Sequence, residues 1–193
     1  VFLALTIIAS LLCWNVAPAR AEAAKRLSIV TTIFPEYDWV RQILGEKFPD
    51  ADVTMLLDNG VDLHSYQPTA DDIIKISDCD LFIYVGGESD GWVDDVLKNS
   101  TNKDMKVVDL LDVLGDNVKN EETVEGMQEE EEEHGEENEE EKDEHVWLSL
   151  KNAEVLCNAI ADALEEIDPD NKDVYAENAS AYIAKLSALD KDY

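Results

Sequence analysis

The feature that most constrains the fold is an alternation of short apolar runs with helical segments in the first half of the chain. Each apolar run is short and rich in β-branched or aromatic residues, which is typical of a buried strand. Strands separated by helices of this length pair in parallel through right-handed crossovers. We therefore predict an α/β lobe with a four-stranded parallel sheet. The strands are expected at Leu27–Ile33, Asp52–Leu57, Leu81–Val85 and Lys106–Leu110, and the helices between them at Glu36–Glu46, Thr69–Ser77 (with Thr69 as N-cap) and Trp92–Asn99.

Two further helices are expected near the end of the chain. Lys151–Ile167 carries an amphipathic stripe and is ended by Asp168-Pro169. Asn171–Tyr193 is a longer helix, which we expect to run along the lobe or towards another one. Because the chain starts at Val1 and stops within this helical pattern, we expect it to be a fragment.

The first 21 residues resemble a targeting segment. An apolar run, VFLALTIIASLLCWNV, precedes Ala-Pro-Ala-Arg-Ala, the pattern of a secretory signal peptide. We predict cleavage after Ala21, with lipidation at Cys13 and a buried N-terminal helix as alternatives. The run is shorter than the roughly 20 apolar residues that span a membrane. The mature chain is therefore expected outside the cytoplasm, in the periplasm or at the cell surface.

Charge excludes several kinds of partner. The 193 residues contain 45 acidic and 15 basic side chains, a net charge of −30, so a nucleic-acid partner is not expected. Residues 121–145 alone hold 15 acidic residues and one basic residue. Like charges at this density predict a disordered, solvated loop over residues 116–144. It interrupts a lobe of residues 22–170, which residues 171–193 follow as a separate helix.

The mature chain keeps two cysteines, Cys79 and Cys157, each among apolar neighbours. A disulfide is permitted in an extracytoplasmic compartment, but we favour two buried small hydrophobic residues. Nothing in their spacing resembles a metal site or a disulfide framework.

The sequence has only three histidines. His64 lies in the loop that leaves the second predicted strand, and His145 lies where order returns after the acidic run. Both are therefore expected at the carboxyl ends of parallel strands, the edge where open α/β sheets bind ligands. Neutral imidazole suits zinc and related ions, and Tyr66 and Trp147 could wall off such a site. A solvated or capping role is the alternative for each histidine. His134, inside the acidic run, is expected to make a low-affinity contact only.

Two segments carry a resemblance to a known family: GVDLHSYQPTADDIIKISDCDLFIYVGG at 60–87 and EHVWLSLKNA at 144–153. They resemble the metal-binding receptors of bacterial ABC transporters for zinc and manganese, of the zinc-uptake type. The resemblance implies that His64 and His145 are metal ligands, and an acidic loop before the second histidine is a feature of zinc members. Leu150 and Glu144 depart from the family pattern, since many relatives have proline there.

The same resemblance implies a fold of two lobes joined by a long helix, with a third and a fourth ligand supplied by the second lobe. This chain would then be the N-terminal lobe, with Asn171–Tyr193 as the start of the connecting helix. The ligand that separates zinc from manganese is not in the sequence.

We therefore predict an extracytoplasmic solute-binding protein, not an enzyme, that captures Zn²⁺, with Mn²⁺ as the alternative metal. As a monomer it would deliver this cargo to a membrane permease. Two other functions are weighed. A secreted zinc-dependent hydrolase would need an open coordination position, and no hydrolase, protease or phosphate-binding motif occurs. An acidic cation-binding or adhesion module would use the glutamate run, but the EF-hand spacing is missing.

Overall fold

The computed structural model describes residues 26–58, 60–119 and 142–193. Its centre is a sheet of four strands that all run parallel, in the order β2-β1-β3-β4. The predicted parallel α/β architecture is therefore confirmed. The strands are β1 (Ser28–Thr31), β2 (Asp52–Met55), β3 (Leu81–Tyr84) and β4 (Lys106–Asp109).

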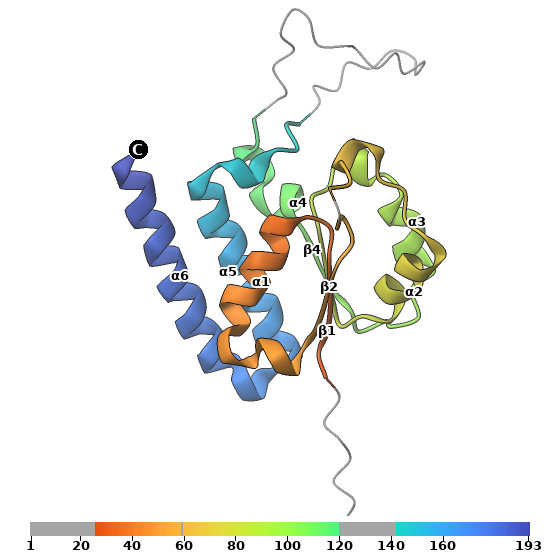
Figure 1. Ribbon diagram of the computed structural model, residues 1–193, viewed down its shortest axis with the longest axis horizontal. Helices are drawn as coiled ribbons and strands as arrows, with labels where there is room; N and C mark the ends of the chain where they lie inside the picture. Colours follow the sequence, from red (N-terminus) through yellow and green to blue (C-terminus); the bar gives the residue numbers. More distant parts are fainter. Residues whose placement is uncertain (1–25, 59, 120–141) are drawn as a thin grey trace, which may run out of the picture.

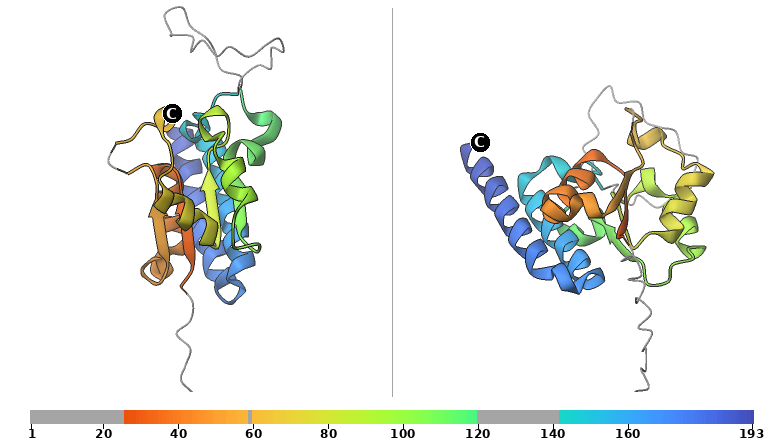
Figure 2. Two further views of the ribbon diagram at one scale, coloured as in Figure 1. Left: turned by 90° about the vertical axis from the view of Figure 1, so that its right-hand side faces the viewer. Right: turned by 60° about the horizontal axis from the view of Figure 1, so that its bottom comes forward.

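Helices cover both faces of the sheet (Figure 1). On one face α5 packs on β4, α1 packs on β1, and both pack against α6; on the other face α2 and α3 pack together. The right-hand view of Figure 2 shows α6 on the outer side of this first layer. The helices are α1 (Phe34–Leu44), α2 (Ala70–Asp78), α3 (Val93–Lys98), α4 (Leu110–Leu114), α5 (Leu150–Ile167) and α6 (Lys172–Asp192).

The two central strands, β1 and β3, are mostly buried, as strands covered by helices on both faces require, whereas β2 and β4 at the edges are more exposed. Ile29 is paired with Val53 on one side and with Leu81 on the other. Phe82 and Ile83 of β3 are fully buried. The sheet therefore forms the rigid base from which the loops at its carboxyl edge project.

The helix boundaries follow local chemistry. Helix α1 begins at Phe34, two residues before the predicted start, since Pro35 suits a first helical turn. It ends before Gly45, whose φ of 52° leaves the helical region. Helix α2 begins after Thr69, whose hydroxyl accepts the backbone N–H of Asp72 while the Asp72 carboxylate accepts from Thr69. The predicted N-cap of α2 is thus confirmed.

One helix was not predicted. Helix α4 begins at Leu110, where the predicted strand Lys106–Leu110 was expected to end. The Asp109 side chain accepts the backbone N–H of Asp112 and so caps this helix. The run LLDVL at 110–114 has apolar residues at both strand and helix spacing, so the hydrophobic pattern alone does not distinguish a strand from a helix here.

The ends of the predicted acidic loop, residues 116–144, are ordered where the structure describes them. Gly115–Asn117 form a 3₁₀ turn, and Glu144 is buried. The backbone N–H of Asp143 donates to the carbonyl of Lys119 at 2.9 Å, so the two ends lie side by side. Residues 120–141, including His134, and the predicted signal peptide with Cys13 and Ala21 lie outside the described residues.

Both cysteines of the predicted mature chain are free and buried. Burial raises the pKa of the Cys79 thiol, and likewise that of Cys157, to about 12. The prediction of two buried small side chains is confirmed. Within the described part of the chain, no helix has the length and apolar character needed to cross a membrane.

Candidate metal-binding site

The two predicted histidines lie in loops at the carboxyl edge of the sheet. His64 is in a 3₁₀ turn, Leu63–Ser65, between β2 and α2, and His145 directly precedes the 3₁₀ turn Val146–Leu148 that leads into α5. This edge is where a ligand is expected in an open parallel sheet. The sequence prediction therefore placed both residues in the correct region.

The same local turn, closed by an aspartate side chain, positions both histidines. In Asp62-Leu63-His64 the aspartate side chain accepts the backbone N–H of the histidine two residues later at 3.0 Å. In Asp143-Glu144-His145 the corresponding distance is 2.8 Å. An aspartate that bonds to the backbone two residues on forms a rigid turn from local sequence alone. Each D-x-H tripeptide thus presents its imidazole from a defined loop.

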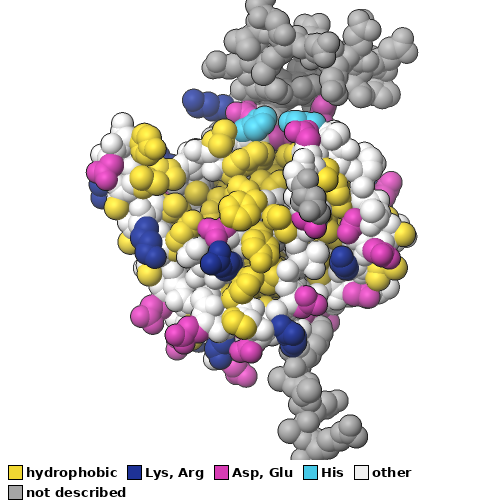
Figure 3. All heavy atoms as spheres, viewed as in Figure 1, with side chains coloured by type: hydrophobic (Ala, Val, Ile, Leu, Met, Phe, Trp, Pro, Cys, Tyr) yellow, Lys and Arg dark blue, Asp and Glu magenta, His cyan; other side chains and the backbone are white. Residues whose placement is uncertain are grey.

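The two imidazole rings are neighbours. Their centres are 5.7 Å apart, with an angle of 51° between the ring planes. The side chain of His64 is 51% exposed and that of His145 is 46% exposed, and the histidines lie close together at the upper edge of the molecule in Figure 3. A zinc ion lies about 2.0–2.1 Å from a ligating imidazole nitrogen. Two rings at this separation can therefore hold one ion between them.

Asp143 contacts one ring nitrogen of His145 and so favours one tautomer of the ring. Its Oδ1 lies 3.0 Å from Nδ1 of His145. Hydrogen bonds from the backbone N–H and the ring of His145 lower the pKa of Asp143, so the carboxylate is ionised and can only accept. This contact favours the tautomer with hydrogen on Nδ1, which leaves the Nε2 lone pair for a metal.

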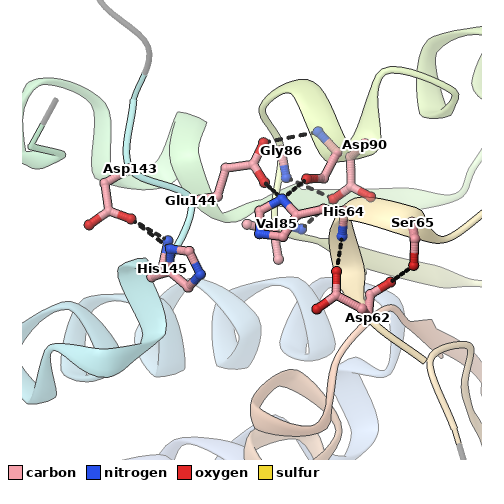
Figure 4. A network of polar contacts seen from close by, with 10 residues as sticks. Asp62, His64, Ser65, Val85, Gly86, Asp90, Asp143, Glu144 and His145 are labelled. Carbon is pink, nitrogen blue, oxygen red and sulfur yellow. Dashed lines mark hydrogen bonds and ion pairs between the residues drawn. The ribbon is translucent and has the colours of Figure 1, made fainter. Parts of the chain in front are cut away.

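The ring of His64 is approached by two groups from other elements. Nδ1 lies 2.9 Å from the hydroxyl of Ser89 and 3.8 Å from Oε2 of Glu144. Figure 4 shows the carboxylate of Glu144 pointing towards His64 while Asp143 faces His145. Among the described residues, the polar contacts of both rings run through Nδ1.

A buried carboxylate lies beneath this arrangement. Oδ2 of Asp90 accepts the backbone N–H groups of Val85 and Gly86, both at 3.0 Å, at the end of β3. Burial, together with repulsion by Glu144, raises the pKa of Asp90 to about 6. Glu36, at the start of α1, is also buried, and burial holds its pKa well above the usual value. The lobe therefore buries two acidic side chains, Asp90 and Glu36, that are close enough to repel each other.

The aromatic residues differ from the expectation. The ring of Trp147 lies 5.3 Å from that of His145, so this side chain does border the site. Tyr66 is buried instead, with its ring against Trp92 and its hydroxyl donating to Asp72. Its helix-capping partner draws it into the core, and it does not wall off the histidines.

Two residues of the site were missed from the sequence. Ser89 and Asp90 lie in the loop after β3, in the 3₁₀ turn Glu88–Asp90, so the rule that located His64 and His145 after strands would have found them as well. Within the described ranges, no group of three or more histidine, cysteine, aspartate or glutamate side chains is arranged to hold a metal. The described part of the chain therefore presents a pair of half-exposed imidazoles at the sheet edge.

Comparison with known proteins points to one family. Residues 29–193 match the model of the family described as "Zinc-uptake complex component A periplasmic". The chain is 32% identical over its whole length to the zinc-binding protein AdcA of Streptococcus pyogenes, of which it covers 38%. It is 38% identical, over 87% of its length, to the high-affinity zinc uptake system protein ZnuA of Bacillus subtilis, of which it covers 50%.

Solved structures agree with the fold. The crystal structure of Zn(II)-bound AdcA from Streptococcus pneumoniae matches 88% of this chain, and 32% of its own, at a TM-score of 0.67 and 33% identity. A Mn²⁺ complex of FpvC from Pseudomonas aeruginosa matches 87% of this chain, and 57% of its own, at a TM-score of 0.66 and 27% identity. The chain thus spans about half or less of the length of these relatives.

Proposed function

We propose that this chain, which belongs to the zinc-uptake complex component A family, is the first lobe of an extracytoplasmic receptor that captures Zn²⁺ as cargo. His64 and His145 would bind the ion through their Nε2 atoms. No bond of a substrate is made or broken in this function. The pair of imidazole rings, 5.7 Å apart and both half-exposed at the sheet edge, is the observation that carries the proposal.

The chemistry of the pair supports capture rather than permanent retention. A structural zinc site is closed by four protein ligands, whereas a site that exchanges its ion keeps open positions. Imidazole nitrogen suits zinc, and manganese favours sites richer in oxygen ligands. Zinc is therefore the proposed cargo, with Mn²⁺ as the alternative, in line with the Mn²⁺ complex of a structural relative.

The remaining ligands would come from a second lobe. The relatives are at least about twice as long as the part that this chain matches. Phe34, just after β1, and Leu148, just after His145, are large apolar side chains exposed at the same edge, and such residues mark surfaces that another part of a protein covers. In this arrangement α6, which packs along α5 and α1, would lead to the second lobe.

Location and partners follow from the same proposal. The family is described as periplasmic and one relative as a zinc uptake protein, and the signal peptide expected at 1–21 agrees with transport across the membrane. The receptor would act as a monomer and pass its ion to the permease of an ABC transporter. The acidic run of residues 121–145 would raise the local concentration of cations near the site through the electrostatic field of its carboxylates.

The proposal is tested by zinc titration of the chain, followed site by site in NMR spectra. His64→Ala and His145→Ala should each weaken binding at the sheet edge by about 100-fold or more, because one of two ligands of a site worth about 10–16 kcal/mol when complete is lost. Both side chains lie in loops outside the core, so the fold should be retained.

His134→Ala serves as the matched control, since it removes an imidazole from the acidic run of the sequence. It should leave binding at the edge unchanged. If both ligand variants bound zinc as the original chain does, His64 and His145 would not be the ligands.

A further inference from the structure

One oxygen of a buried carboxylate, that of Glu144, has no hydrogen-bond partner in the described structure and faces the ring of His64. Glu144 is a buried residue whose side chain is 10% exposed. Its Oε1 accepts the backbone N–H of Ser89 at 3.0 Å. Its Oε2 is buried and makes no hydrogen bond in the described structure, yet it lies 3.8 Å from Nδ1 of His64. An unpaired buried carboxylate oxygen is costly, so this placement calls for a role.

We propose that Glu144 is a positioning residue that holds His64 in the tautomer able to bind a metal. This inference rests on the proposed function, in which His64 is a ligand. A carboxylate only accepts, so it favours the ring form with hydrogen on Nδ1. The lone pair is then on Nε2, the nitrogen on the other side of the ring. A second group that fixes a ligating histidine in this way typically contributes 10–100-fold in metal affinity.

The hydroxyl of Ser89 does not by itself select the tautomer of His64. Its hydroxyl lies 2.9 Å from Nδ1 of His64, but a hydroxyl both donates and accepts, so it is compatible with either tautomer. Its backbone N–H, however, anchors Oε1 of Glu144 and thereby directs Oε2 towards the ring. The charge of Glu144 decides the tautomer, and Ser89 holds both partners in place.

The tripeptide Asp143-Glu144-His145 thus orients both histidine rings. Asp143 contacts Nδ1 of His145 at 3.0 Å, and the next residue, Glu144, reaches back to a ring that is 80 positions earlier in the chain. Because adjacent residues orient the two imidazoles, a displacement of this tripeptide would disturb both together. Figure 4 shows the two carboxylates directed to different rings.

The test uses the Glu144→Gln substitution, which preserves the shape of the side chain. The amide oxygen can still accept from the backbone N–H of Ser89, so the amide NH₂ takes the place of Oε2. An NH₂ group donates, and it would favour the opposite tautomer, with hydrogen on Nε2 of His64. Long-range ¹H–¹⁵N NMR spectra of the metal-free chain at mildly alkaline pH report which ring nitrogen carries hydrogen.

We expect hydrogen on Nδ1 of His64 in the original chain, a shift towards Nε2 in the Glu144→Gln variant, and zinc affinity about 10–100-fold lower in that variant. Glu154→Gln is the matched control. It removes the same charge from a side chain that contacts Ser187 on α6 and should alter neither the tautomer nor the affinity.

Two results would overturn the inference. One is hydrogen on Nε2 of His64 in the metal-free original chain, a measurement that needs no variant to fold. The other is a folded Glu144→Gln variant with unchanged tautomer and affinity. Failure of the proposed function looks different, because His64→Ala would then leave zinc binding intact whatever the tautomer of His64.

Discussion

At the scale of single residues, Gly87 provides the space that Glu144 occupies. Its φ is 79°, a conformation that side chains rarely adopt, and a Cβ added there would collide with Oε1 of Glu144. With ψ at −164°, Gly87 lies in a region essentially restricted to glycine, so we expect Gly87→Ala to lower the free energy of unfolding by about 1–3 kcal/mol through its backbone alone. It should also weaken zinc binding, because the added methyl displaces Glu144. Urea denaturation and zinc titration measure the two effects.

Gly60 separates these two effects. Its φ is 76°, close to that of Gly87, but no described atom lies within 4 Å of an added Cβ. Gly60→Ala should therefore also destabilise the fold through its positive φ, and it should leave zinc affinity nearly unchanged. Equal zinc affinity in the two variants would contradict the role given to Gly87.

Asp90 predicts a dependence of stability on pH. Its pKa is about 6 in the folded chain, against 3.8 for an ordinary aspartate. Between these values the folded state keeps a proton that the unfolded state has released. The stability that this proton supplies is complete below about pH 4 and is lost as pH rises to about 6. The full difference corresponds to about 3 kcal/mol.

Asp90→Asn isolates this contribution, because asparagine can accept the same two backbone hydrogen bonds and does not ionise. Relative to the original chain, the variant should gain up to about 3 kcal/mol of unfolding free energy between pH 4 and pH 7. Asp94→Asn on α3, where the carboxyl is exposed, should show a much smaller change. If the free energy of unfolding changed with pH in the same way in both variants, Asp90 would not be the source of the pH dependence.

At the scale of elements, the acidic segment is predicted to be separable from the site. The backbone bond between Lys119 and Asp143 brings its two ends together, so a short Gly-Ser linker can replace residues 120–141. Zinc binding at the histidine edge should persist, while additional weak binding should disappear, since a run of like charges binds cations by charge density that salt screens. Calorimetry at low and high salt distinguishes the two classes of site.

A chain with this linker that lost binding at the edge would show instead that the segment supplies a ligand to the main site. The hydrogen bond from the backbone N–H of Asp143 to the carbonyl of Lys119 offers an internal check. Hydrogen exchange of the Asp143 amide should remain slow if the linker preserves this hydrogen bond.

At the scale of the whole molecule, the number of ligands limits affinity. The described residues supply two imidazoles, about half of a complete zinc site. Half of the roughly 10–16 kcal/mol of such a site corresponds to a Kd on the order of 10⁻⁴ to 10⁻⁶ M. Affinity should fall as the solution is acidified, because protons compete for the same ring nitrogens. Nanomolar binding by this chain, independent of pH, would show that its site is complete without a second lobe.

Much of this molecule was open to prediction because the relevant signals are local. Hydrophobic periodicity predicted four strands and the helices around them, and the capping chemistry of Thr69 located the start of α2. Since parallel strands share one carboxyl edge, the positions of His64 and His145 after strands were enough to bring them to one place. The D-x-H turns that present them are local as well.

Only the tertiary structure decided the order β2-β1-β3-β4, the short helix α4 and the surroundings of each ring. The contact of Glu144 with Ser89 and His64 joins three loops that are far apart in sequence, and the burial of Asp90 depends on all the elements packed around it. Neither has a periodic or motif signal, because each depends on distances across the fold. The sequence by itself determined which residues could bind a metal; the packing of the lobe determined how those residues are oriented and charged, since only packing sets burial and the partners of Nδ1.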